Sequence, residues 1–205
     1  KPAGLLSMGN EKERARTAYR MVSDYVKARE PGGRIFIVHR LDRDTSGVLV
    51  FAKNERMKRA LQDHWEALVQ KRGYVAAVEG DLPEPEGTVR SYLRETTTHL
   101  VYSAPRGKEG REAVTHYRVL ARGKGFSLVE VNIDTGRKNQ IRVHMQDLGC
   151  PVAGDRQYGA QSDPMGRLAL HAHVLRFTDP RSKKTLELKA SLPLGFQKLF
   201  PGAEQ

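Results

Sequence analysis

A charged stretch, His39-Arg40-Leu41-Asp42-Arg43-Asp44-Thr45-Ser46-Gly47, separates two short apolar runs, Ile35–Val38 and Val48–Phe51. Both runs are rich in β-branched and aromatic residues and have the length of strands. The connection therefore brings two arginines, two aspartates and a histidine to one edge of a predicted sheet. Polar groups on a loop held by strands are typical of functional sites, and a salt-bridged turn is the structural alternative. The loop alone leaves both interpretations open.

Helical periodicity appears on both sides of this stretch. Asn10 followed by Glu13 is typical of a helix start, and the apolar spacing predicts an amphipathic helix over 11–28. A second helix is predicted over 55–68, and a third over 138–148. The caps expected for these two helices are Asn54 at the start of the second and Gly149 at the end of the third. The residues expected to face the core are Ala15, Ala18, Tyr19, Val22 and Val26 in the first helix, Met57, Leu61, Trp65 and Leu68 in the second, and Ile141, Met145 and Leu148 in the third.

Extended segments follow one another through the middle and the end of the chain, with turns rich in glycine, proline and charge between them. The predicted strands span 74–79, 87–94, 113–121, 126–133, 174–177 and 185–190. Strands that follow strands indicate antiparallel pairing. The predicted fold class is therefore α+β, a mainly antiparallel mixed β-sheet with flanking helices. The connection 105–111 has no apolar residue after its first position and is predicted to be a mobile loop.

A length of 205 residues is sufficient for one domain with a sizeable core, and a single domain over 1–205 is predicted. The chain begins at Lys1-Pro2-Ala3-Gly4 without an initiator methionine or an apolar signal segment. We therefore expect that a short N-terminal piece is missing. No further sequence feature indicates an obligate protein partner, so a monomer is expected.

The composition indicates a polyanionic partner. Lys and Arg number 35 against 24 Asp and Glu, a formal net charge of +11, spread along the whole chain. No run approaches the roughly 18 apolar residues of a membrane-spanning helix, so nucleic acid is favoured over a membrane. The single cysteine, Cys150, excludes an internal disulfide and a cysteine-based metal cage, and it suits the cytoplasm.

Several catalytic classes lack their motifs here. No H-E-x-x-H is present, and only the i, i+2 pair His171 and His173 keeps a metal pair formally open. A leucine separates Arg40 from Asp42, which breaks the kinase H-R-D pattern, and neither G-x-S-x-G nor a Walker sequence occurs. We therefore predict no metal and no cofactor.

A carboxylate acting without a metal remains as the candidate chemistry. An aspartate serves as a nucleophile toward an electron-poor carbon when it is ionised. Burial raises a carboxyl pKa by about 3 to 5, and an adjacent guanidinium lowers it by about 1 to 3. A buried nucleophilic aspartate thus requires a nearby arginine, and Arg40 and Arg142 are the candidates.

Two blocks of the sequence carry a family resemblance. They are His39-Arg40-Leu41-Asp42-x-x-Thr45-Ser46-Gly47 and Thr135-Gly136-Arg137-x-x-Gln140-Ile141-Arg142-Val143-His144. Together they closely resemble the two signature blocks of the RluA-type pseudouridine synthases. Supporting matches are Lys1-Pro2-Ala3-Gly4, the segment 74–80, Pro151-Val152-x-Gly154-Asp155-x-x-Tyr158-Gly159 and Leu170-His171-Ala172-His173. These segments follow the family's order along nearly the whole chain.

The resemblance implies an isomerase that breaks the C1′–N1 bond of a uridine in RNA, rotates the base and rejoins it through C5, within a central RNA-binding cleft. It implies that Asp42 is the catalytic nucleophile, that Tyr74 stacks on the base and assists proton handling, and that Arg142 pairs with the catalytic carboxylate. Arg40 resembles the side chain that fills the gap left by the flipped nucleotide, and Leu170 the apolar residue near the base. Further substrate contacts are implied for His39, Thr45, Arg137 and Gln140. Asp44 falls on a variable position.

One departure from the family pattern is the pair Lys138-Asn139, where many relatives have threonine and histidine, so that a charge is added which would tune RNA contact. The expected partner is ribosomal or transfer RNA, and the sequence leaves the choice open. The alternative function is a non-catalytic RNA-binding or RNA-folding protein on the same scaffold. A hydrolase that releases the free base is the third.

Overall fold

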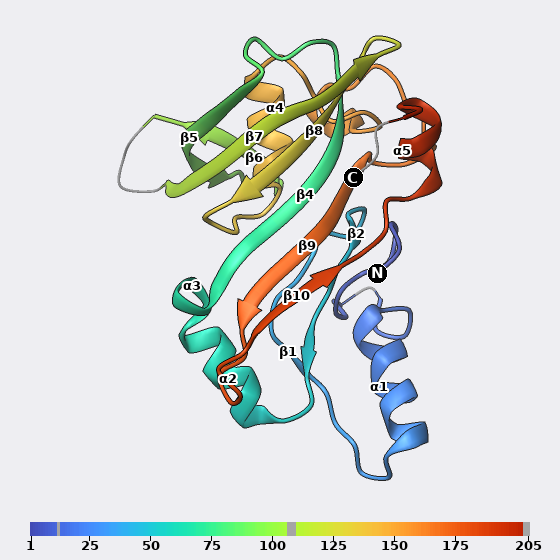
Figure 1. The fold of residues 1–205 in the computed structure, drawn as a ribbon, viewed down its shortest axis with the longest axis vertical. Helices are drawn as coiled ribbons and strands as arrows, with labels where there is room; N and C mark the ends of the chain where they lie inside the picture. The colour runs from blue at the N-terminus through green and yellow to red at the C-terminus, as the bar shows by residue number, and fades with distance from the viewer. Residues whose placement is uncertain (12, 106–109, 203–205) are drawn as a thin grey trace. The chain divides into compact units, whose positions relative to one another are not determined.

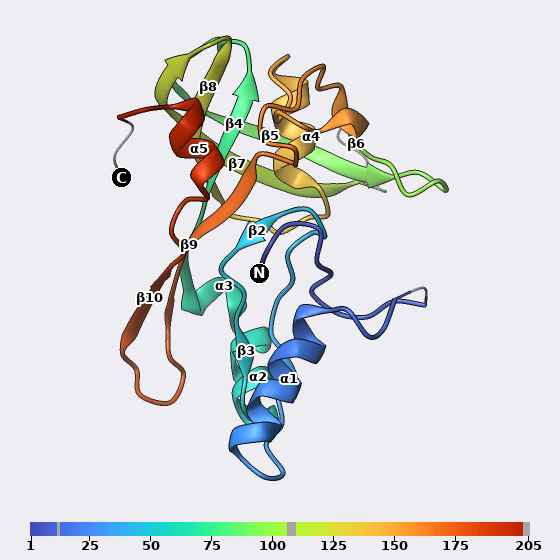
Figure 2. The ribbon, with the colours of Figure 1, turned by 90° about the vertical axis from the view of Figure 1, so that its right-hand side faces the viewer.

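The computed structural model describes residues 1–11, 13–105 and 110–202 (Figures 1 and 2). Its internal contacts divide the chain into two compact units. Unit 1 consists of Lys1–Lys71 and Val174–Ala190, and unit 2 of Arg72–His173 and Ser191–Gln205. Strands β4 and β9 pass from one unit into the other. The single domain expected from the sequence stays a prediction.

Unit 2 is built on an antiparallel sheet with the strand order β9-β4-β8-β7-β5-β6. The strands are β4 (Val69–Glu79), β5 (Glu86–Glu95), β6 (Val101–Ala104), β7 (Arg111–Gly123), β8 (Phe126–Ile133) and β9 (Leu170–Thr178). Figure 1 shows the long β4, β7 and β8 running side by side, and the pairings β4–β8, β8–β7, β7–β5 and β5–β6 are antiparallel. The predicted fold class, α+β with a mainly antiparallel sheet, is confirmed.

The core of unit 2 is centred on β4 and β8. Ala76, Ala77 and Val78 are fully buried in succession. Because neighbouring residues of a strand point to opposite faces, this part of the sheet is covered on both sides. The covering elements include α4 (Gln140–Asp147) and α5 (Leu194–Leu199), whose Ile141, Met145, Phe196 and Leu199 join the same cluster.

In the part of unit 1 that the structure describes, there are three helices and several short strands. They are α1 (Ala18–Arg29), β1 (Phe36–Ile37), β2 (Ser46–Gly47), β3 (Phe51–Ala52), α2 (Glu55–Asp63), α3 (Trp65–Leu68) and β10 (Thr185–Lys189). The predicted runs 35–38 and 48–51 pair only where β1 meets β3, antiparallel. Strand β10 pairs with the second half of β9. Within the described residues, no helix combines the length and the apolar character needed to cross a membrane.

The first predicted helix is wrong at its start. Asn10 Oδ1 does accept from the Glu13 amide at 2.8 Å, but the Glu13 carboxylate then accepts from the amides of Ala15 and Arg16, which closes a turn. The helix begins only after Thr17, whose Oγ1 accepts from the Arg20 amide. As a consequence Ala15 is exposed rather than in the core.

The other helices follow their predicted signals more closely. Asn54 Oδ1 accepts from the Met57 amide at 2.8 Å and caps α2, as predicted, but the helix breaks at His64 and resumes as α3. Helix α4 ends before Gly149, which has a φ of +75°. Strand β6, helix α5 and the short 3-10 helix Arg156–Tyr158 were not predicted. Residues 106–109 of the predicted mobile loop lie outside the described residues.

Candidate functional site

The two aspartates of the 39–47 loop in unit 1 differ in solvent exposure. Asp42 is partly buried, whereas Arg40 and Asp44 are exposed. The Thr45 amide donates to the Asp42 carbonyl at 3.2 Å, which closes a turn, and Thr45 itself is only 2% exposed. Thr45 therefore shapes the loop around Asp42.

The N-terminal segment holds this loop in place within unit 1. Ser7 Oγ donates to the Leu41 carbonyl at 2.7 Å and accepts from the Leu41 amide at 3.0 Å. The side-chain Nζ of Lys1 donates to the Arg43 carbonyl at 2.7 Å. The backbone on both sides of Asp42 is thus fixed by residues outside the loop, a contribution that the sequence pattern did not indicate.

His39, at the start of the loop, is tied to its own unit. Its Nε2 accepts from the Val50 amide at 3.1 Å, and its ring centroid lies 5.3 Å from that of Trp65. These contacts join the beginning of the loop to the chain just before β3 and to α3. The geometry favours a positioning role for His39.

Arg142 of α4, in unit 2, has an elaborate set of partners. Its Nε and Nη2 donate to the two carboxylate oxygens of Asp155 at 2.6 and 2.7 Å, in a bidentate pair. Nη1 donates to Asn139 Oδ1 and Nη2 to Gln157 Oε1, and the guanidinium lies 4.7 Å from the Tyr158 ring centroid. The side chains of Arg142 and Asp155 are 12% and 1% exposed. This planar cation is held in one orientation.

Two buried residues support the Arg142 cluster from behind. Asn139, in the left-handed region with φ of +54°, donates from Nδ2 to the Tyr158 hydroxyl at 3.1 Å, and that hydroxyl also accepts from the Val101 amide. Tyr158 is 2% exposed. Sequence reasoning missed Asn139, Asp155 and Tyr158 as site residues, although Asp155 and Tyr158 stood in one of the matching segments.

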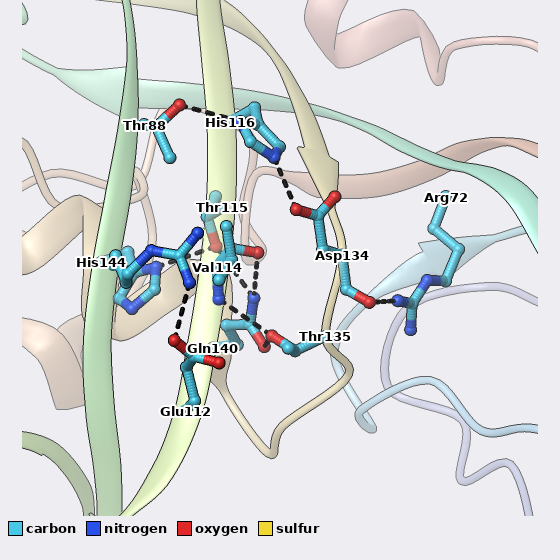
Figure 3. A network of polar contacts seen from close by, with 11 residues as sticks. Arg72, Thr88, Glu112, Val114, Thr115, His116, Asp134, Thr135, Gln140 and His144 are labelled. Carbon is cyan, nitrogen blue, oxygen red and sulfur yellow. Dashed lines mark hydrogen bonds and ion pairs between the residues drawn. The ribbon is translucent and has the colours of Figure 1, made fainter. Parts of the chain in front are cut away.

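Gln140 begins α4 and uses its whole amide to attach the helix to β7 (Figure 3). Its Oε1 accepts from Thr135 Oγ1 at 2.7 Å and from the Arg137 amide at 3.0 Å. Its Nε2 donates to the Val114 carbonyl and to Thr115 Oγ1. Two donors and two acceptor positions are all the capacity of a glutamine amide. Since Gln140 is also only 3% exposed, this geometry favours positioning of the 135–137 turn over direct RNA contact.

His144 continues the same attachment one turn along α4. Thr115 Oγ1 accepts from Gln140, so the Thr115 hydroxyl hydrogen is available to His144 Nδ1, 2.8 Å away. With Nδ1 as the acceptor, His144 Nε2 carries the proton and donates to Ser91 Oγ at 2.9 Å. The Oγ atoms of Ser91 and Ser103 lie 3.1 Å apart, and Ser103 Oγ donates to Asp147 Oδ2 at 2.5 Å. Because the single Ser103 hydroxyl hydrogen goes to Asp147, Ser91 Oγ is the donor between the two serines. Burial lowers the pKa of His144 below its ordinary 6.5, with Asp147 opposing the shift. This series of hydrogen bonds requires a neutral His144.

The Thr115 hydroxyl is the joint of this network, and Thr115→Val should lower the free energy of unfolding by about 2 to 4 kcal/mol, because a Gln140 donor and the His144 acceptor lose their partner inside the protein. Urea unfolding of both proteins measures the change. Thr115→Ser keeps the hydroxyl and is the matched control, expected to cost about 1 kcal/mol for the lost methyl group. Equal losses for Val and Ser would contradict the network.

Tyr74 and Leu170 lie on strands that are neighbours in the unit 2 sheet. Tyr74 is partly buried on β4, opposite Val131 of β8. Leu170, at the start of β9, is 3% exposed within the main core cluster. Arg72, two residues before Tyr74, donates from Nη2 to the Asp134 carbonyl, as Figure 3 shows. Tyr74 therefore lies on a strand that is hydrogen-bonded to the 134–137 turn through Arg72.

Arg137 is the last residue of that turn and Lys138 follows it, and both are exposed. Arg137 Nε donates to the Glu112 carbonyl at 3.0 Å. Lys138 Nζ lies 2.5 Å from Glu95 Oε1. The hydrogen bond from Lys138 is the largest cause that lowers the pKa of Glu95, and the hydrogen bond from His99 is the next. The added charge at Lys138 is therefore partly compensated within unit 2.

Each unit thus gathers its own part of the predicted site. Unit 1 fixes Arg40, Asp42 and Thr45 on one loop, and unit 2 joins Arg142 to the Gln140 network. The pairing of Arg142 with Asp42 stays a prediction. Among residues 1–11, 13–105 and 110–202, no three His, Cys, Asp or Glu side chains are grouped to hold a metal ion.

Known proteins resemble this chain in sequence. A family profile described as RNA pseudouridylate synthase matches residues 1–147. The uncharacterized RNA pseudouridine synthase YhcT of Bacillus subtilis is 34% identical over 201 residues, covering 97% of this chain and 66% of that protein. The tRNA pseudouridine synthase C of Haemophilus ducreyi is 33% identical, covering 98% of this chain and 88% of that protein.

Coverage and structure add two facts. The chain spans 66% and 52% of the lengths of two uncharacterized RNA pseudouridine synthases of Bacillus subtilis, YhcT and YlyB. The solved structure of human RNA pseudouridylate synthase domain containing 1 is 27% identical with a TM-score of 0.70, covering 84% of this chain and 74% of that chain. Human RNA pseudouridylate synthase domain containing 4 superposes with a TM-score of 0.79 at 24% identity, covering 97% and 87%, a similarity of fold.

Proposed function

Because the chain belongs to the RNA pseudouridylate synthase family, we propose that it isomerises uridine to pseudouridine in structured RNA. The observation that carries the proposal is the family match over residues 1–147, which includes both signature blocks up to His144. The formal charge of +11 supports an RNA partner. Pseudouridine synthesis moves a base from N1 to C5 on the same ribose, so it consumes no second substrate.

The proposed chemistry uses three residues. Asp42 attacks C1′ of the flipped uridine, the C1′–N1 bond breaks and the base departs with the electron pair. After the base rotates, C5 attacks C1′ and displaces the carboxylate, and the C5 proton is lost while N1 gains one. Tyr74 stacks on the base and assists this proton transfer. Arg142 is assigned as the cation that pairs with the Asp42 carboxylate.

The remaining site residues are assigned by their exposure. Arg40 is exposed at the beginning of the 39–47 loop, and we assign it to the gap that the flipped nucleotide leaves in the RNA stack, because a planar cation stacks and donates hydrogen bonds at once. Arg137 is also exposed and contacts RNA phosphate. Positioning roles suit the more enclosed His39, Thr45, Gln140 and Leu170.

The class of RNA is proposed from the relatives' names. One relative is the tRNA pseudouridine synthase C of Haemophilus ducreyi, and another is the ribosomal large subunit pseudouridine synthase D of Neisseria meningitidis, 36% identical over 172 residues. Transfer RNA and ribosomal RNA are therefore both proposed as substrates to test. The enzyme is proposed to act as a monomer without cofactor.

The test incubates the purified protein separately with unmodified transfer RNA transcripts and with protein-free ribosomal RNA. Pseudouridine is then quantified by mass spectrometry of nucleosides, and released uracil is measured in the same samples. Isomerisation predicts pseudouridine without free uracil. Release of uracil would favour the hydrolase, and tight binding without any product would favour the RNA-binding alternative.

A further inference from the structure

A groove in unit 1 lies between α1 and the segment leading into β1. It has a volume of about 490 Å³ and is lined by Tyr19, Ser23 and Lys27 of α1, by residues 34–37, and by Lys58 of α2. In Figure 1, α1 and α2 lie on either side of β1 within this unit. None of these residues belongs to the site described above.

Three cations converge on the groove without compensation. The side chains of Lys27, Arg34 and Lys58 form no ion pair with any described residue. Three acidic groups of unit 1, on α1, at its C-cap and on α2, are engaged by other cations. These pairs are Arg20 with Asp24 at 2.9 Å, Lys53 with Glu30 at 2.6 Å and Arg59 with Glu55 at 2.6 Å. The groove therefore gathers three positive charges that these acidic groups do not compensate.

The shape of the site determines which anion it suits. A concave surface with apolar walls focuses the potential of its charges, which attracts anions. A volume of about 490 Å³ falls in the range of sites that hold an organic ligand and exceeds what one inorganic phosphate fills. Tyr19 and Ser23 also line the groove, and both residue types carry a hydroxyl group. A sugar-phosphate segment matches these features.

The groove is also within reach of the nucleophile along the chain. Ile37, on the wall of the groove, and Asp42 are five residues apart in sequence and belong to the same unit. Five residues span at most about 18 Å, even when fully extended. One folded RNA that presents a uridine at Asp42 is long enough to cover this distance.

We propose that the groove is a second RNA contact, which binds the sugar-phosphate backbone of the substrate away from the target uridine. The proposal rests on the proposed function, because it takes RNA as the substrate. Its role is to add affinity and to orient the RNA, so the groove residues take no part in bond breaking.

The experiment compares two triple variants that each remove three positive charges from unit 1. The groove variant is Lys27→Gln, Arg34→Gln and Lys58→Gln. The matched control, Arg20→Gln, Lys53→Gln and Arg59→Gln, removes cations that are already paired with acids. Binding of unmodified transfer RNA transcripts and of protein-free ribosomal RNA is measured by filter binding between 50 and 200 mM salt, and pseudouridine formation is measured in parallel.

The groove variant should lose about 10- to 100-fold in RNA affinity at 100 mM salt. The slope of log affinity against log salt should fall by about 2 to 3, as for three lost phosphate contacts. KM should rise by the same factor with kcat within about twofold of the unchanged protein. The control should lose less than about threefold in affinity.

Equal effects of the two triple variants, or unchanged RNA affinity of the groove variant, would overturn the proposal. Failure of the proposed function has a different signature. In that case the unchanged protein forms no pseudouridine in either RNA, yet the loss of affinity confined to the groove variant still supports the groove. Thermal unfolding of both variants confirms that each remains folded.

Discussion

Replacing Asp42 by asparagine should abolish pseudouridine formation, with a loss in kcat of at least about 10⁴-fold. The amide is nearly isosteric with the carboxylate but is neutral and a poor nucleophile, so no covalent bond to C1′ forms. RNA affinity should stay within a few-fold, because removal of one acid from a basic protein does not weaken phosphate binding. Single-turnover conversion of uridine to pseudouridine, measured with enzyme in excess over RNA, gives the rate directly.

Asp44 supplies the matched control for this prediction. It lies on the same loop, two residues further on, and is exposed where Asp42 is partly buried. Asp44→Asn removes the same charge and should keep kcat within about threefold. Substantial residual activity in Asp42→Asn, or an equal loss in Asp44→Asn, would remove Asp42 from the role of nucleophile.

The parts of the fold that the sequence predicted well depend on local signals. Strand β8 was predicted at its observed bounds, 126–133, because a β-rich run ends at clear turn residues on both sides. The cap at Asn54 and the stop at Gly149 are likewise contained in a few neighbouring residues. The predicted start of α1 is wrong because two helix-start signals compete. The Glu13 carboxylate closes a turn, and the helix begins only after Thr17.

The site residues also fall into two groups: those that local sequence signals indicate and those that depend on the fold. The 39–47 loop stands out in the sequence because charged groups interrupt an apolar pattern there, and Arg142 stands out through the signature block that contains it. The partners of these groups do not, since the pairing of Arg142 with Asp155 and of His144 with Thr115 depends on how α4 lies on the sheet. From the sequence, Arg40 and Arg142 are the candidate charge partners of Asp42. The acid that holds Arg142 itself in place, Asp155, becomes evident only in the structure.

Asp155→Asn should lower the free energy of unfolding by about 3 kcal/mol, because it removes the charge that compensates a guanidinium only 12% exposed. Activity should fall as well, since the bidentate pair fixes the plane of Arg142. Chemical denaturation measures the first effect, and single-turnover kinetics the second. Glu55→Gln, in the exposed Arg59–Glu55 pair, is the control, expected to change stability by less than about 1 kcal/mol.

A double-mutant cycle separates the ion pair from the packing around it. Asp155→Leu leaves Arg142 without its bidentate partner, and Arg142→Met leaves Asp155 without its cation. The combination of the two substitutions removes both charges at once. Because a lone buried charge costs more than an apolar pair of similar volume, the double variant should be more stable than Asp155→Leu by about 1 to 3 kcal/mol. It should also be inactive, since no guanidinium remains at position 142. Purely additive losses would mean that Asp155 supports the fold through its own turn rather than by holding Arg142.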